Sequence, residues 1–151
     1  MAEIFNPYEV INSWLKENYT PLNDWIYFNC IPASPAAVAL NSVPGDAYER
    51  KFITGAVEKS VIFSIDMVQN YDPSGTSYTN LEAMNEVLQM TEWLKLQNKD
   101  MNFPPFGEGF EISMMEILTN VPSLLIDTTS GLAKYQFQGR IVYIDRREEI
   151  I

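Results

Sequence analysis

Histidine is absent from the sequence, and cysteine occurs only once among its 151 residues. Without histidine, the chain cannot use Ser-His-Asp or Cys-His catalysis, bind a metal through imidazole, or switch with the titration of that ring. Most common hydrolase chemistry is therefore excluded. Cys30 alone cannot form an internal disulfide or a zinc cluster. Because residues 25–31 are mostly aromatic or β-branched, we expect Cys30 to be a small core hydrophobe in a reducing cytoplasm.

Positive charge is also scarce. Ten basic residues stand against 20 acidic ones, which gives a net charge of -10 and an isoelectric point near 4.3. This is the wrong sign for a chain that grips phosphate backbones, so we expect no specific nucleic-acid binding. The acidic residues are scattered between Glu3 and Glu149, which is typical of a solvated surface.

Long hydrophobic runs are missing as well. No stretch of about 18 consecutive apolar residues occurs, and no apolar stretch follows a basic segment at the N-terminus. We therefore expect a protein that neither spans a membrane nor is exported. The 46 % of hydrophobic residues are enough for one core, and the length fits one domain. We expect residues 1–151 to form a single domain that ends in a charged C-terminal tail over 146–151.

Two segments have helical patterns with start signals. The first helix is expected over residues 7–18, with Asn6 as N-cap and Pro7 in the first helical position. The second is expected over 80–97, because Thr-Asn-Leu-Glu at 79–82 has the spacing of a capping box. The apolar stripe of this second helix is expected at Leu81, Met84, Val87, Leu88, Thr91 and Leu94.

Alternation of apolar and polar residues predicts the main strands. Residues 59–68 and 132–144 alternate most clearly, and the first of these is expected to be half-buried. Further strands are expected at residues 25–31, 36–40, 48–53, 110–119 and 124–128. The order of elements predicts an α+β fold: a single domain with a largely antiparallel mixed sheet and the two main helices packed on one face.

Reactive constellations are weak. Asp66 and Glu111 could pair as an acid and a base across a sheet, but a solvated outer face would place the same residues there. Asp145, Glu148 and Glu149 are poor metal ligands as a set, because adjacent side chains diverge and two neighbouring arginines compete for them. We therefore expect no catalytic residue, no cofactor and no metal site.

Residues 99–109 are expected to form a loop that is stiffened by proline. It contains Phe103, Pro104, Pro105 and Phe106 in succession. Exposed apolar residues on such a loop often mark a protein contact, whereas the same residues could instead pack on the edge of the domain. Both interpretations stay open here, and these four residues are candidate assembly contacts.

Several phrases of the sequence also resemble those of a known family. They are Trp14-Leu15, the strand, loop and helix over 62–97 with Tyr71-Asp72, Asn80-Leu81 and residues 92–98, and the closing strand over 133–143. Together with the order of elements, they resemble the tail terminator family of tailed bacteriophages and phage-derived contractile particles. Members of this family are also called minor capsid proteins.

The resemblance implies a structural role without a cofactor. Six copies would form a ring at the head-proximal end of the tail tube, stop its polymerisation and join the tail to the neck or head. Its partners would be further copies of the chain, the tube protein, a neck or head-completion protein and, in a contractile tail, the sheath protein, with DNA passing through the ring. The protein would be made in the host cytoplasm and end in the virion or phage-tail-like particle. Tyr71, Arg146 and Arg147 are further candidate contacts.

Two other interpretations remain open. The chain could be another neck, head-completion or tail component, which ring stoichiometry and the end of the tail that it binds would distinguish. It could also be a small-molecule-binding module, or an enzyme that uses only Asp, Glu, Tyr or Lys. A closed apolar pocket with a few converging polar groups would favour this last interpretation.

Overall fold

The computed structural model describes residues 4–19, 25–44, 50–119, 121–127 and 130–150. Two helices and a seven-stranded, mostly antiparallel mixed sheet form one compact α+β domain, which confirms the predicted fold class. The elements are α1 (Pro7–Asn18), β1 (Ile26–Phe28), β2 (Val38–Ser42), β3 (Arg50–Lys51), β4 (Val57–Asn70), α2 (Thr79–Lys99), β5 (Phe110–Ile117), β6 (Ser123–Asp127) and β7 (Leu132–Asp145).

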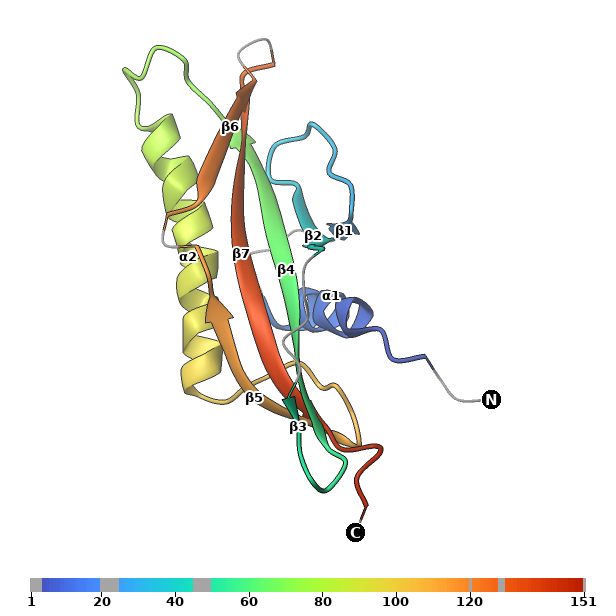
Figure 1. Cartoon of the computed structure of the whole chain (residues 1–151). Helices are drawn as coiled ribbons and strands as arrows, with labels where there is room; N and C mark the ends of the chain where they lie inside the picture. The colour runs from blue at the N-terminus through green and yellow to red at the C-terminus, as the bar shows by residue number, and fades with distance from the viewer. Residues whose placement is uncertain (1–3, 20–24, 45–49, 120, 128–129, 151) are drawn as a thin grey trace.

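The sheet is built on β4 and β7, which lie at its centre (Figure 1). They pair antiparallel along their whole length, from Val57 opposite Asp145 to Asn70 opposite Leu132. The main path runs β1-β2-β4-β7-β5, while β3 also pairs with β4 and β6 also pairs with β7. Only the pairing of β1 with β2 is parallel among the strand pairs of the described residues.

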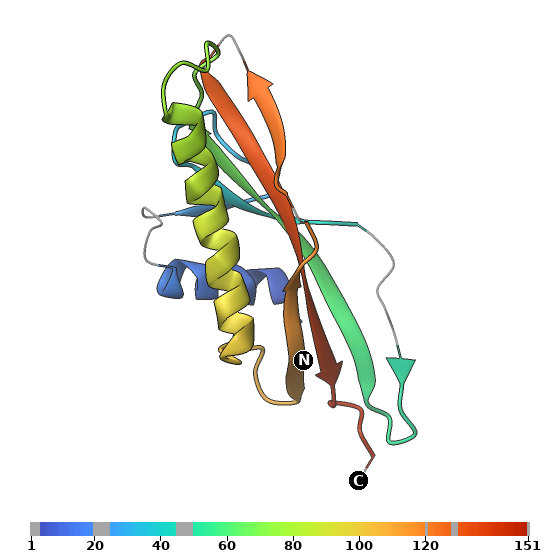
Figure 2. The same ribbon diagram turned by 90° about the vertical axis from the view of Figure 1, so that its left-hand side faces the viewer.

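Both helices cover the same face of the sheet, as predicted (Figure 2). The rings of Trp14 in α1 and Trp93 in α2 lie 5.2 Å apart, so the helices also contact each other. Along β7, every second residue is buried toward this face, in agreement with the alternation predicted for 132–144. The start of α1 is as predicted, because the Asn6 side chain accepts a hydrogen bond from the Tyr8 backbone N–H at 3.1 Å.

The capping box predicted for α2 is wrong. Thr79 lies inside the helix, and the N-cap residue Tyr78 makes no side-chain cap. Asn80 is used differently: its amide oxygen accepts from the Asp72 backbone N–H at 2.8 Å, and its amide nitrogen donates to the Asp72 carbonyl at 2.9 Å. The side chain therefore fastens the preceding loop to the helix, which continues to Lys99, two residues beyond the expected end.

The predicted apolar stripe of α2 is only partly correct. Val87 and Leu94 are buried as expected, whereas Leu81 and Leu88 are exposed. Ala83 and Met90 take their place in the core, so the buried face is rotated relative to the prediction.

Burial of β4 and of Cys30 also differs from expectation. Ser64, on the face of β4 expected to be open, is buried like the apolar face, and so is Val68 at the end of the expected strand. Cys30 is exposed instead of buried in the core. The reason is local: β1 ends at Phe28, and Asn29 has a positive φ of 55°, which turns the chain out of the sheet before Cys30.

Gly139 is required at the centre of the sheet. It lies opposite Phe63, and a Cβ placed on it would come within 2.5 Å of the Phe63 ring. Phe63 is fully buried, so the ring has little room to move. Contact between the bare backbone of β7 and this ring therefore depends on glycine.

We predict that Gly139→Ala lowers the free energy of unfolding by about 1–3 kcal/mol, because overpacking a filled core forces side chains off their rotamers. Urea denaturation of the purified protein measures the loss. The matched control is the same substitution in a Phe63→Leu background, where the smaller side chain should make it cost clearly less. Equal losses in both backgrounds would contradict the contact.

Candidate assembly surface

The face of the sheet opposite the helices is polar. Lys134, Gln136, Gln138 and Arg140 follow one another on this side of β7, each of them half-buried. Arg140 pairs with Glu116 of the neighbouring strand β5. Long polar side chains therefore lie across the strands here, and they keep this face wet while shielding the backbone beneath.

Asp66 is the buried centre of this polar face, with 5 % of its surface exposed. Its carboxylate accepts hydrogen bonds from Asn41 at 3.0 Å and Gln136 at 2.7 Å, and Lys134 Nζ lies 3.9 Å away. The expectation of a solvated Asp66 is therefore wrong. Its neighbours on β2 and β7 cover it and satisfy its charge, as a buried carboxylate requires.

Glu111 lies too far from Asp66 for an acid–base pair. On β7, Asp66 is opposite Gln136 and Glu111 is opposite Ile144. Strands rise by about 3.4 Å per residue, which separates the two positions by roughly 27 Å. Glu111 is instead exposed and pairs with Arg146. The arrangement supports a structural role for both carboxylates.

The loop with the candidate contacts packs on the domain. Pro104 and Phe106 are buried, Phe103 is half-buried against the core, and Pro105 is exposed. The Phe106 ring lies 5.1 Å from Phe5 and 5.2 Å from Tyr143, in edge-to-face contacts. Of the two interpretations left open by the sequence, packing is the one that the structure shows for Phe106. An assembly role for Phe103 and Pro105 stays a prediction.

Tyr71 also lies against the core, and its backbone N–H donates to the Gly131 carbonyl at 2.9 Å. The next residue, Asp72, organises the loop after β4 by accepting hydrogen bonds from the hydroxyls of Ser74 and Ser77, both at 2.7 Å. These bonds lower the pKa of Asp72 to about 2. Tyr71 and Asp72 thus hold the loop after β4 against the end of the sheet where β7 begins.

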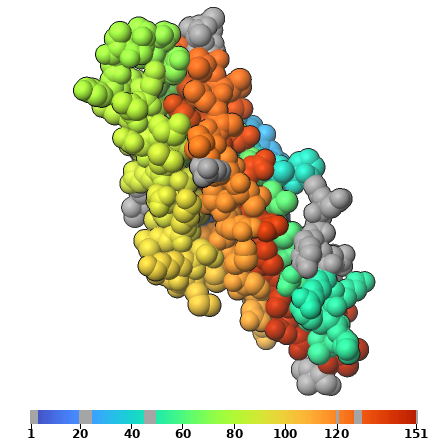
Figure 3. Space-filling model, turned by 60° about the vertical axis from the view of Figure 1, so that its left-hand side comes forward, coloured from blue at the N-terminus to red at the C-terminus, as the bar shows by residue number. Residues whose placement is uncertain are grey.

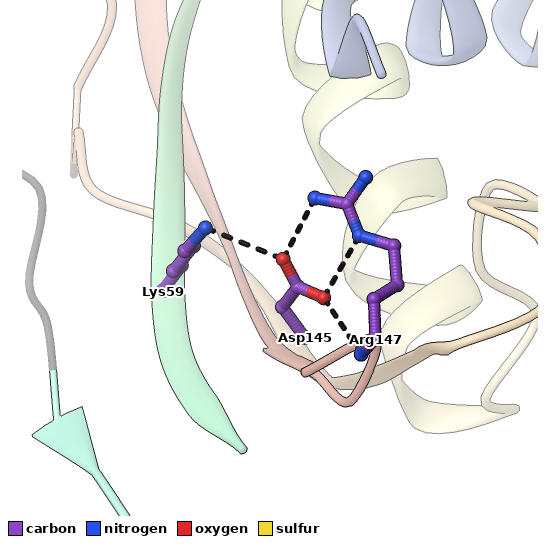
Figure 4. A network of polar contacts seen from close by, with 3 residues as sticks. All are labelled: Lys59, Asp145 and Arg147. Atoms are coloured by element: carbon purple, nitrogen blue, oxygen red, sulfur yellow. Dashed lines mark hydrogen bonds and ion pairs between the residues drawn. The ribbon is translucent and has the colours of Figure 1, made fainter. Parts of the chain in front are cut away.

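Arg147 is held by a network with Asp145 and Lys59 (Figure 4). The buried Asp145 carboxylate accepts from the Arg147 guanidinium at 2.9 and 3.0 Å and from Lys59 at 3.3 Å. The hydrogen bonds from Arg147 hold the pKa of Asp145 well below its ordinary value. The guanidinium also lies over the Phe110 ring, 4.6 Å from its centre. The Arg147 guanidinium therefore makes its hydrogen bonds and its ring contact within the subunit.

Arg146 and the residues after it run across the end of the sheet. Arg146 bonds Glu111 and Glu149, both at 2.7 Å, and its backbone N–H donates to the Gly109 carbonyl at 2.7 Å. The Ile150 N–H donates to the Thr54 carbonyl at 2.6 Å. The charged segment over 146–150 is thus fastened to two loops, and the ion pairs at its surface face solvent.

The strand β6 carries the feature that sequence reasoning missed. It pairs with β7 on one side and has no other strand partner among the described residues. Leu124, Leu125 and Ile126 follow one another along it, and all three are exposed, Leu125 by 65 %. Figure 3 looks toward this edge, with the orange segment of β5 and β6 beside the yellow-green of α2. Three consecutive aliphatic residues without alternation were the available signal.

A groove lies at the opposite edge of the sheet, between α1 and β1. It has a volume of about 420 Å³. Its lining combines the apolar or aromatic Tyr8, Trp25, Ile26 and Phe28 with the polar Asn6, Glu9, Asn12, Ser13 and Lys16. Trp25 and Phe28 are exposed, and Lys16 Nζ lies 4.3 Å from the centre of the Trp25 indole. The β1 edge of the sheet therefore presents apolar side chains, as the β6 edge does.

No family model matches the sequence, and no curated protein matches it significantly. Within the described ranges, no helix is long and apolar enough to cross a bilayer. The same residues contain no group of three or more acidic or cysteine side chains arranged to hold a metal ion.

We predict that Phe106→Ala lowers the free energy of unfolding by about 3–5 kcal/mol, because it removes a buried ring from an aromatic cluster. Thermal melts and urea denaturation measure the loss. Glu108→Ala, an exposed position of the same loop, is the control and should change stability by about 0.5 kcal/mol or less. A Phe106 variant as stable as the control would show that the ring is available for another role.

We predict that Asp145→Asn costs about 1–3 kcal/mol at neutral pH, because it removes charged hydrogen bonds to Arg147 and Lys59. The pKa of Asp145 is lowered in the folded protein, so its contribution is present above the unfolded value of 3.8 and is lost as the pH falls through the lowered pKa. Denaturation at pH 7 and at stepwise lower pH should show the two proteins converging below pH 3.8. A constant difference would contradict this account.

Proposed function

We propose that this chain is a structural virion subunit, not an enzyme, that forms a ring at the head-proximal end of a phage or phage-like tail tube. The ring, most simply of six copies, ends tube polymerisation and joins the tail to the neck or head. The proposal draws on the resemblance to the tail terminator family and on the surfaces of the subunit.

The observation that carries the proposal is the exposure of consecutive aliphatic side chains along the edge strand β6. Soluble monomers rarely leave an edge strand with consecutive large aliphatic side chains, because such an edge invites pairing with another chain. Leu124, Leu125 and Ile126 are exposed on a protein whose net charge is -10. An edge of this kind on an otherwise charged subunit is expected of a component that acts by assembly.

The charge distribution is compatible with DNA in the lumen of a ring. The polar face of the sheet pairs its cations with carboxylates, as in Arg140 with Glu116 and Lys134 with Asp66. A surface with few unpaired cations on an acidic subunit offers little adhesion to a phosphate backbone. DNA could then pass such a ring without being held.

We predict that adding the purified chain to its polymerising tube protein gives shorter tubes with a narrower length distribution, because a bound ring blocks further addition. Negative-stain electron microscopy measures tube length and shows whether one end carries an additional ring. Buffer and the loop variant Glu108→Ala serve as controls for dilution and for a neutral change.

Two results would separate the alternatives. Tubes with bare ends and unchanged lengths would overturn the terminator role. A ring that binds the head or portal side but leaves tube growth unchanged would instead identify a head-completion or neck component. Native mass spectrometry of the bound ring gives the number of copies in either case.

A further inference from the structure

We infer that the β6 edge of one subunit seats in the groove between α1 and β1 of a second copy of this chain. The inference rests on the proposed function, since it states how neighbouring subunits of the ring would meet. The partner of β6 is thus the β1 edge of the sheet in the neighbouring copy.

The two edges lie at the same level of the sheet. Strand pairing connects Ile26 of β1 to Val38 of β2, then to Met67 of β4, Tyr135 of β7 and Leu124 of β6. This row crosses the whole sheet from one free edge to the other. Copies placed side by side in one plane would therefore bring β6 of one subunit next to β1 of the next.

Two of the three aliphatic side chains of β6 share a face with Phe28 at the other edge, while Leu125 is opposite Lys134 on the polar face. Leu124 and Ile126 are opposite Tyr135 and Ala133 on β7, which are buried toward the helices. At the other edge, Phe28 is on the helix side, where its ring lies 5.7 Å from that of Tyr8 in α1. If the sheet continues from copy to copy, Leu124 and Ile126 point at the groove beside α1.

The groove has room for these side chains. An apolar cavity of about 150 Å³ holds a benzene molecule, and the groove measures about 420 Å³. Asn12 Nδ2 already donates to the Ile26 carbonyl at 3.2 Å, so that edge acceptor is satisfied within the subunit. The contact is therefore made mainly by side chains that fill the groove, and to a lesser extent by new backbone hydrogen bonds.

Strand directions set the geometry of the contact. β1 is parallel to β2, and each further step through β4, β7 and β6 is antiparallel, so β1 and β6 run in opposite directions. The edges of adjacent copies would thus meet antiparallel. Because the two surfaces are different, the contact is heterologous, and repeating it closes a ring or extends a filament.

The native Cys30 provides a direct test. It is exposed and lies just after β1, while Val121 is exposed just before β6. If the two strands pair antiparallel with Ile26 of one copy opposite Leu124 of the next, position 121 lies opposite Asn29 and therefore close to Cys30. A Val121→Cys variant of the full chain, treated with a short bismaleimide, should give a ladder of covalent oligomers on denaturing gels.

Three controls define the result. The unchanged chain has one thiol and can form at most a cross-linked dimer. Ile53→Cys, which places a thiol at a fully exposed position between β3 and β4, away from β1 and β6, should give no ladder. Adding Leu124→Asp to the Val121→Cys variant should weaken association by about 30-fold and remove the ladder. Its melting temperature should stay unchanged, since Leu124 is exposed in the subunit.

The outcomes separate this contact from the proposed function. If Val121→Cys gives no ladder either in the concentrated free protein or in assembled particles, the contact is wrong. Tubes that are nevertheless capped by rings would then leave the terminator role intact. A ladder that Leu124→Asp removes, without any effect of the chain on tube length, would support the contact and overturn the terminator role.

Discussion

The antiparallel pairing of β4 with β7 is the constraint on which the remaining structure depends. Each strand has 14 residues, so the pair is roughly 45 Å long at about 3.3 Å per residue. The 21 residues of α2 reach only about 32 Å at 1.5 Å per residue. One helix cannot cover such a strand pair, so other segments must shield its ends.

Shielding differs at the two ends. At the end near Tyr143, the rings of Phe5, Phe106 and Phe110 form a cluster, and Arg147 lies over Phe110. Residues from the N-terminal segment, the 99–109 loop and the C-terminal segment therefore meet there. At the other end β6 pairs with β7, but its own aliphatic side chains stay exposed. Aromatic rings thus cover one end of the strand pair, whereas at the other end the aliphatic side chains of the edge strand β6 are exposed.

The features that could be predicted from the sequence are those that depend on a local pattern of residues. β7 alternates because one face is buried and the other is wet, and α1 begins at Asn6 and Pro7 because capping is a local interaction. Burial of Asp66 was not predictable, since Asn41 and Gln136 cover it from strands distant in the sequence. The same holds for Phe106, whose environment is decided by Phe5 and Tyr143.

The candidate surface was predictable only in part. The sequence indicated a strand near residues 124–128, but exposure of its aliphatic side chains depends on which element packs beside it. α2 illustrates the same limit, because Leu81 and Leu88 have helical spacing with each other yet are exposed, Leu81 by 64 %, while Ala83 and Met90 on another face of the helix are buried. Apolar spacing shows which residues share a face, whereas tertiary packing decides which face of the helix is covered.

The contact proposed between β6 and β1 is small, which affects when subunits would associate. β6 offers five residues and β1 three, far fewer than the roughly 20–30 residues a side of a stable interface. Such a contact would be weak between two free subunits that also repel each other through a net charge of -10. Binding to a common template raises the effective concentration of neighbouring copies and makes the same contact favourable. A subunit built in this way would stay apart in solution and assemble where a tube end holds its neighbours.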